Sequence, residues 1–208
     1  MGKKMMKILI GTLIHISKDY AMERWLENVS KLQQKYPADF LMVDNSPGTG
    51  YVEKLKSYCK KYGIKKYKIK HIEVSQGMIG DEVQERIAKA QEIIRQEVLS
   101  KDYDAWWSWE SDIILPTNSL GKLIGMIRGG IMVVVHNSWM RRHPGHPDFD
   151  MGCTLISREA LKKCAFLPEP GSSYWQGEDD LYKLRVLEGG GSFAEVVGLI
   201  EPIYHLAE

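Results

Sequence analysis

Apolar and polar positions follow two different rhythms along the first half of the chain. Short apolar runs predict buried strands at Lys7–Leu13, Phe40–Val43, Tyr67–Val74, Ala105–Trp109 and Ile131–Val135. Between these runs, apolar residues recur every three or four positions, which predicts helices over Asp19–Tyr36, over Tyr51–Tyr62, and from Asp81 through Val98. Strands separated by helices are typical of a mostly parallel sheet with helices on both faces, so we expect an α/β fold.

Residues that favour helix ends support these boundaries. Pro37 directly follows the first predicted helix, and Gly63 follows the second, where a glycine cap is common. Asp81 and Gln84 have the spacing of a capping box at the start of the third helix.

The second half of the chain has a weaker periodicity. We expect a long loop over residues 137–152 and a second loop over residues 167–177. The elements predicted around them are a strand at Cys153–Ser157, helices at Arg158–Cys164 and Asp179–Glu188, and a strand at Phe193–Leu199. The chain contains no internal repeat, low-complexity segment or linker, so residues 1–208 are expected to form a single domain.

Bulk properties narrow the class of protein. The chain has 208 residues, of which 44% are hydrophobic, and this suits one sizeable domain, with two small ones as the alternative. Its formal net charge of +1 argues against nucleic acid as a partner. Its three cysteines are far apart and odd in number, so they predict neither a disulfide framework nor a zinc site. A reducing compartment, the cytoplasm, is the expected location.

The N-terminus has a weak similarity to a signal peptide, because lysines precede an apolar run. Gly11, Thr12 and His15 interrupt that run, and no small-residue cleavage site follows it. We therefore interpret the run as a core strand. No apolar stretch reaches the ~20 residues that a membrane-spanning helix needs.

Polar residues follow several of the predicted strands. Asp44 and Asn45 follow the second strand, and His136 and Asn137 follow the strand that begins at Ile131. In an open parallel sheet, ligands bind beyond the carboxyl ends of the strands. We expect these side chains to meet along one edge of the sheet.

An acidic pair ends the tryptophan-rich strand, in the stretch "WWSWESDIILP". Glu110 and Asp112 are two positions apart, with Ser111 between them, so both carboxylates face one way in an extended chain. Buried anions need a partner, and a hard divalent cation such as Mg²⁺ or Mn²⁺ suits carboxylate oxygens. The alternative is a pair of surface carboxylates that bind nearby lysines.

Four segments in order resemble the nucleotide-sugar glycosyltransferases of the GT-A fold, particularly the large family-two-like group. They are "KILIGTLIH" before a helix, "VDNS" after the second strand, "ERIAKAQEIIRQEVLSKDYDAWWSWESDI", and "MGCTLISREAL" followed by "WQGEDDLYKLRVLEGG". The resemblance covers most of the chain and implies a single-domain, Rossmann-like GT-A fold. Residues 1–115 would form the nucleotide-sugar-binding half and residues 116–208 the acceptor-binding half.

The resemblance implies roles for the donor side of the site. Asp112 would be the main metal ligand, and Glu110 would support the metal or the ribose, with Ser111 beside them. Asp44 would contact the base or ribose, and Arg86 the nucleotide. The first acidic residue of the pair is Glu where the family pattern has Asp, which leaves the role of Glu110 less defined. A surface ion pair with Glu82 is the alternative for Arg86.

The resemblance also implies the groups that act on the acceptor. Asp179 would be the general base that takes the proton of the attacking hydroxyl, with inversion at the anomeric carbon, and Glu178 would orient the acceptor. Helix capping is the alternative for each of these acidic residues, because negative charge at a helix start is stabilising. Trp139 and Trp175 lie in loops, and they either stack on sugar faces or anchor the loops.

Histidines offer two further candidates. The resemblance implies that His205, near the C-terminus, is an additional metal ligand, with a structural role as the alternative. The segment "HPGHPDFD" is read as an acceptor-binding loop in preference to a zinc site formed by its imidazoles and carboxylates.

Trp106, Trp107 and Trp109 are expected to pack in the core. Lys66, Lys68 and Lys70 alternate with apolar residues, which predicts an edge strand with a lysine-bearing face, or a membrane-surface patch for a lipid-linked acceptor.

The sequence therefore predicts a metal-dependent hexosyltransferase-like enzyme. Its partners would be a UDP- or GDP-sugar donor and a carbohydrate, lipid-linked or protein acceptor. A sugar nucleotidyltransferase is disfavoured because the Gly-rich Arg/Lys loop of that group does not follow the first strand. A non-catalytic carbohydrate-binding protein is the remaining alternative.

Overall fold

The computed structural model describes residues 5–77, 81–136, 151–167 and 178–206. The strands are β1 (Ile8–Ile14), β2 (Asp39–Asp44), β3 (Tyr67–His71), β4 (Ala105–Trp109), β5 (Ile113–Ile114), β6 (Val133–His136), β7 (Cys153–Ser157), β8 (Phe193–Val196) and β9 (Tyr204–His205). The helices are η1 (Ile16–Lys18), α1 (Asp19–Lys35), α2 (Gly50–Lys61), α3 (Asp81–Ser100), α4 (Ser119–Arg128), α5 (Arg158–Lys163) and α6 (Glu178–Glu188).

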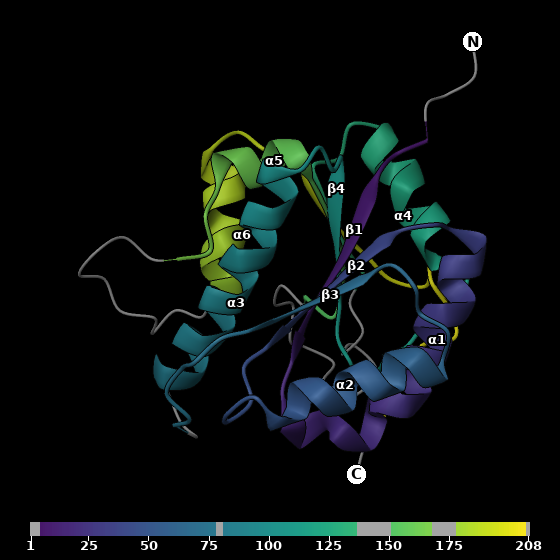
Figure 1. Ribbon diagram of the computed structural model, residues 1–208. Coiled ribbons are helices and arrows are strands. Elements are labelled where there is room, and N and C mark those ends of the chain that lie inside the picture. Colours follow the sequence, from purple (N-terminus) through teal and green to yellow (C-terminus); the bar gives the residue numbers. More distant parts are fainter. Residues whose placement is uncertain (1–4, 78–80, 137–150, 168–177, 207–208) are drawn as a thin grey trace.

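A seven-stranded sheet with the order β3-β2-β1-β4-β7-β6-β8 runs through the molecule (Figure 1). β7 is antiparallel to its neighbours β4 and β6, and the other pairs in this sheet are parallel. The predicted α/β fold with a mostly parallel sheet is confirmed. Strands from both halves of the sequence join this one sheet.

Helices cover both faces of the sheet. In Figure 1, α1, α2 and α4 lie on one side and α3, α5 and α6 on the other. Each layer has its own apolar cluster, one containing Trp25 and Trp107 and the other containing Ile94 and Trp106. The three tryptophans of β4 are fully buried, which confirms their predicted place in the core.

The predicted strands and helices are present, most of them with shifted ends, and four elements were missed. Strand β3 ends at His71 instead of Val74, and β8 ends at Val196 instead of Leu199. The missed elements are the short helix η1, the helix α4, and the strands β5 and β9. In α4, Gly121 and Gly125 weaken the helical signal. Strands β5 and β9 are two-residue strands that pair with each other across a long sequence separation, so no local pattern reveals them.

Strand β3 is at the edge of the sheet, as the lysine pattern predicted. Its lysines also have a specific partner, because Lys68 and Lys70 form ion pairs with Glu97 of α3 at 3.2 and 3.1 Å. Burial raises the pKa of the Glu97 carboxyl, but hydrogen bonds from Lys101, Lys70 and Lys68 outweigh it and lower that pKa to about 2.

Within the described ranges, no helix is long and apolar enough to cross a membrane.

Gly11 lies in the middle of β1, where a glycine normally weakens a strand. A Cβ atom at this position would be 2.4 Å from Ile94 Cγ2 and 2.6 Å from Trp106 Nε1. The same indole nitrogen donates a hydrogen bond to the Gly11 carbonyl oxygen at 3.0 Å. Close contact between β1, β4 and α3 therefore requires a residue without a side chain.

We predict that Gly11→Ala lowers the free energy of unfolding by about 2 kcal/mol, because the added methyl group overpacks a tight core. Urea denaturation measures the change. The control is Gly125→Ala in α4, where an added Cβ meets nothing within 4 Å. That change should raise stability by roughly 0.5–1 kcal/mol through helix propensity. Equal effects of the two substitutions would contradict the packing explanation.

Candidate functional site

The carboxyl ends of β1, β2 and β4 meet at one edge of the sheet, where Ile14 of β1 is in register with Asp44 of β2. Beside this edge lies a cavity of about 240 Å³. Polar residues that line the cavity come from distant parts of the chain and include His15, Lys18, Asn45, Arg86, Gln91 and Glu110. Asn45 and Glu110, which follow different strands, therefore lie beside the same cavity.

The acidic pair lies in a tight turn between β4 and β5. The Trp109 indole N–H donates to the Ile113 carbonyl oxygen at 2.7 Å, which fixes the two ends of the turn to each other. β5 pairs with β9, so that Ile113 lies opposite His205. The Leu206 N–H also donates to the Asp112 carbonyl oxygen at 2.7 Å, so the C-terminal segment is held against the turn.

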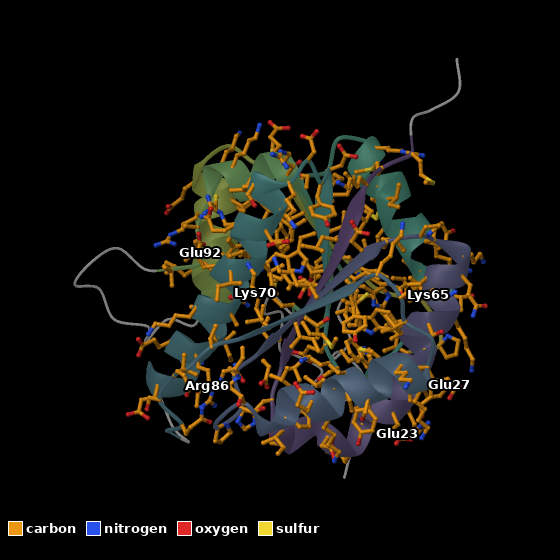
Figure 2. All side chains as sticks on the ribbon, in the orientation of Figure 1. Glu23, Glu27, Lys65, Lys70, Arg86 and Glu92 are labelled. Carbon is orange, nitrogen blue, oxygen red and sulfur yellow. The ribbon has the colours of Figure 1, made fainter. Side chains whose placement is uncertain are left out.

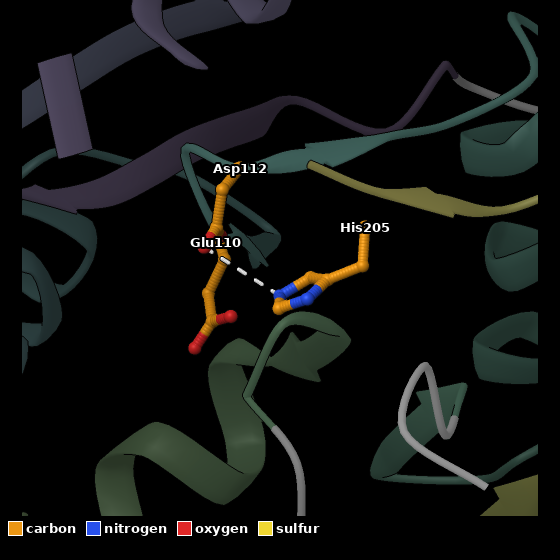
Figure 3. Close-up of side chains that lie close together, drawn as sticks. All are labelled: Glu110, Asp112 and His205. Atoms are coloured by element: carbon orange, nitrogen blue, oxygen red, sulfur yellow. Dashed lines mark ion pairs between the residues drawn. The ribbon is translucent and has the colours of Figure 1, made fainter. Parts of the chain in front are cut away.

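This pairing brings Asp112 and His205, the metal ligands that the resemblance implied, together with Glu110. One potential ligand atom from each of Glu110, Asp112 and His205 lies within 4.8 Å of the others (Figure 3). The distance from His205 Nε2 to Asp112 Oδ2 is 3.5 Å. Two carboxylates and one imidazole suit Mn²⁺ or Mg²⁺, with open positions for other oxygen ligands. Within the described residues, the donor set therefore fits a divalent cation.

Lys18, which the sequence analysis did not single out, lies in the same cluster. Its Nζ is 3.0 Å from Asp112 Oδ2, 3.1 Å from Asp112 Oδ1 and 3.9 Å from Glu110 Oε2. The Asp112 side chain is only 4% exposed, whereas the Lys18 side chain is 36% exposed. Burial lowers the pKa of Lys18, but attraction from Glu110 and Asp112 outweighs it and raises the pKa above the usual value. The local signal was a lysine in the short connection between the first strand and the first long helix, directly before Asp19.

Tyr20 adds a neutral contact to the cluster. Its hydroxyl group is within 3.4 Å of Asp112 Oδ2 and 3.5 Å of the Leu206 carbonyl oxygen. Asp112 therefore has an ammonium group, a phenol and an imidazole around one buried carboxylate. These polar partners offset the cost of removing the carboxylate from water.

Asp44 is fully buried, and both of its carboxylate oxygens have partners. Oδ1 accepts hydrogen bonds from the Ser46 N–H and hydroxyl, and Oδ2 is 2.8 Å from His71 Nδ1. His71 Nε2 is also 3.0 Å from Glu73 Oε1. Asp44 thus organises the ends of β2 and β3, and its expected contact with the nucleotide stays a prediction.

Arg86 lines the cavity and lies near the N-terminal end of α3 (Figure 2). Its guanidinium donates to the carbonyl oxygens of Ser75 and Gly77, each at 3.3 Å. These contacts hold the charged group beside the loop between β3 and α3. The nucleotide contact expected of Arg86 stays a prediction.

The other predicted site residues are not part of the cluster around Asp112. The Ser111 hydroxyl is buried, and it has no hydrogen-bond partner among the described residues. His136 ends β6, at the same edge as β4 but with β7 between the two strands. Trp139, Trp175 and the "HPGHPDFD" loop lie outside the described residues. Helix α6 begins at Glu178, and the side chains of Glu178 and Asp179 are likewise outside the description.

Neither a protein-family model nor a curated protein matches this chain. Solved structures share its architecture. The mannosyltransferase PcManGT from Pyrobaculum calidifontis, in complex with GDP-Man and Mn²⁺, superimposes with a TM-score of 0.71 at 12% identity, over 95% of this chain and 56% of that one. GalNAc-T7 with UDP, GalNAc and Mn²⁺ gives 0.70 at 15% identity, over 99% and 45%. TarS from S. aureus gives 0.62 at 14% identity, over 93% and 35%.

The chain has a GT-A fold. The predicted fold is confirmed by these neighbours, and nearly the whole chain takes part in the match. This GT-A chain spans about half the length of PcManGT and GalNAc-T7, and less of TarS. At such low identity the likeness establishes the fold alone.

The Asp44–His71 pair predicts a pH-dependent contribution to stability. The hydrogen bond to Asp44 raises the pKa of His71, and the bond to Glu73 adds to the effect against the cost of burial. The contribution should be complete below the reference pKa of ~6.5 and should disappear as pH rises through the raised value. The loss of unfolding free energy caused by His71→Gln should therefore be larger at pH 6 than at pH 9.

Chemical denaturation of wild type and variant at both pH values measures this difference. Glu73→Gln is the matched control and should keep most of the pH dependence, because Asp44 is the main partner. A wild-type to His71→Gln difference that stays constant from pH 6 to pH 9 would contradict the assignment.

Proposed function

We propose that this chain is a nucleotide-sugar-dependent glycosyltransferase that requires a divalent metal ion. The observation that carries the proposal is the cluster of Glu110, Asp112 and His205 beside a cavity at the carboxyl edge of a GT-A sheet. Two neighbours of that fold were solved with Mn²⁺ together with GDP-Man or UDP. The donor proposed for this chain is accordingly a UDP- or GDP-sugar.

Asp112 and His205 would hold the metal ion, and Glu110 would complete the set or bind the ribose. Mn²⁺ or Mg²⁺, when bound there, would neutralise the diphosphate leaving group. Arg86 would bind the nucleotide, since its guanidinium is permanently charged and lines the same cavity. Asp44 would contact the base or ribose of the donor, and Ser111 would bind the donor beside the acidic pair.

The acceptor chemistry is proposed from the sequence alone. Asp179, near the start of α6, would take the proton of the attacking hydroxyl group, with inversion at the anomeric carbon, and Glu178 would orient the acceptor. Trp139 and Trp175 would bind the acceptor, which is a carbohydrate, a lipid-linked sugar or a protein. The proposed location is the cytoplasm, in keeping with three cysteines that are all free.

We predict that Asp112→Asn loses the Mn²⁺-dependent binding of GDP or UDP, because it removes a charge and keeps the side-chain shape. Calorimetric titration with and without Mn²⁺ measures the loss, and circular dichroism checks the fold. Asp102→Asn, at an exposed position, is the control and should bind as wild type does. Unchanged diphosphate binding by Asp112→Asn would remove this residue from the metal site.

A screen of nucleotide sugars for thermal stabilisation in Mn²⁺ identifies the donor for the next test. A ligand at 100 times its dissociation constant adds about 2.7 kcal/mol, enough to shift the melting temperature clearly. If neither GDP-sugars nor UDP-sugars shift the melting temperature, the glycosyltransferase proposal fails. The alternative, a non-catalytic protein, then remains.

The second test separates catalysis from donor binding. We predict that Asp179→Asn lowers the transfer rate by about 10²-fold or more, the usual contribution of a general base, and leaves donor affinity within about threefold. The neighbouring Asp180→Asn is the matched control and should be milder. Equal transfer rates for wild type and Asp179→Asn would remove the base from this residue and weaken the inverting assignment.

A further inference from the structure

The Lys18 ammonium group lies where a metal ion would have to bind. Its contacts of 3.0 and 3.1 Å to the two Asp112 oxygens and 3.9 Å to Glu110 are made with the same carboxylates that form the proposed metal site. An ammonium group has only donors to offer, so it uses the lone pairs of these oxygens as a metal ion would. A divalent cation at the same oxygens would repel it strongly, because the two charges would be only a few ångströms apart.

The backbone at Lys18 is held in place, whereas the side chain of Lys18 can rotate. Helix η1 is held by the His15 side chain, which accepts from the Ser17 N–H, and by the Ile16 N–H, which donates to the Ser46 hydroxyl at 2.9 Å. Lys18 ends this helix and lines the cavity that also contains Arg86. A lysine stem has four rotatable bonds, so the ammonium group can leave Asp112 and still reach into the cavity.

We propose that Lys18 is a built-in counter-ion that occupies the cation site of the metal-free protein and moves to the donor phosphates when a divalent metal ion displaces it. The inference rests on the proposed function, because it takes Glu110 and Asp112 as metal ligands. It makes metal binding and diphosphate binding mutually supportive. The diphosphate gives the displaced ammonium group a new partner, and the metal ion releases the ammonium group toward it.

This exchange has a structural reason in the metal-free state. Asp112 is nearly completely buried and has a second carboxylate nearby. Two anions in such a place destabilise the fold unless a cation is present. Lys18 supplies that cation, so the site can fold before the metal ion arrives.

In the experiment, Mn²⁺ alone is titrated into wild type, Lys18→Met and Lys18→Arg. The electron paramagnetic resonance signal of free Mn²⁺ measures how much of the ion each protein binds. Lys18→Met removes the competing charge and should bind Mn²⁺ about tenfold more tightly, a factor that corresponds to ~1.4 kcal/mol. Lys18→Arg keeps the charge and should stay within about threefold of wild type. Lys31→Met removes an exposed lysine that pairs with Glu27, and it controls for net charge without changing Mn²⁺ affinity.

A second titration adds GDP or UDP at a fixed concentration. In wild type the nucleotide should strengthen Mn²⁺ binding, and in Lys18→Met this gain should be smaller. Thermal melts provide an independent readout if the variant folds poorly. Lys18→Met should melt lower than wild type without metal and should gain more from Mn²⁺.

The outcomes separate the two proposals. If Lys18→Met binds Mn²⁺ no more tightly than wild type, while Asp112→Asn loses binding, the exchange is overturned and the metal site stands. If wild type and Lys18→Met both fail to bind Mn²⁺, the metal site is overturned and the exchange with it. Tighter Mn²⁺ binding by Lys18→Met together with a smaller nucleotide effect supports the exchange.

Discussion

A buried carboxylate cannot remain alone, and the candidate site is arranged around this constraint at Asp112. Strand β4 is buried along its whole length and contains three tryptophans, and the acidic turn follows it directly. Lys18, at the end of η1, balances the charge, His205 Nε2 of β9 lies 3.5 Å from Asp112 Oδ2, and Tyr20 of α1 adds a polar contact. Three parts of the chain are thereby held at one place, and the cavity lies beside them.

The turn is positioned by contacts that carry no net charge. The Trp109 indole closes it from one side. From another side, the Asn28 side chain binds the backbone of Leu115, donating to its carbonyl oxygen at 2.9 Å and accepting from its N–H at 2.8 Å. These groups are buried, so each bond lost would leave an unsatisfied polar atom. Rigid support of this kind fixes the spacing of the two carboxylates.

The antiparallel strand β7 makes one sheet from the two halves of the chain. It lies between β4 and β6, and it continues into α5, which packs beside α3. Arg158 of α5 reinforces this junction by donating hydrogen bonds to the carbonyl oxygens of Val98, Leu99 and Tyr103. The part of the sheet that holds the acidic turn is therefore braced by residues from beyond position 150.

The sequence by itself determined the α/β class and most element positions, and it predicted that the acidic pair would need a cation. Those features depend on local periodicity and on the cost of burying charge, both of which can be read along the chain. Motif order also pointed to the GT-A fold, which the solved structures then confirmed. Helix α4 was missed because two glycines in it obscured a periodic pattern.

Only the tertiary structure decided which charges meet. Lys18 and Asp112 are 94 positions apart, and the pairing of β5 with β9 that carries His205 to the site involves two residues on each strand. The tertiary structure also showed that the Asp44 carboxylate lies within hydrogen-bond distance of His71. Contacts of this kind come from the path of the chain through the sheet, and the energy that selects them is packing and desolvation summed over many residues. A local pattern does not contain that sum, which is why the cation beside Asp112 could be expected from the sequence but not assigned to Lys18.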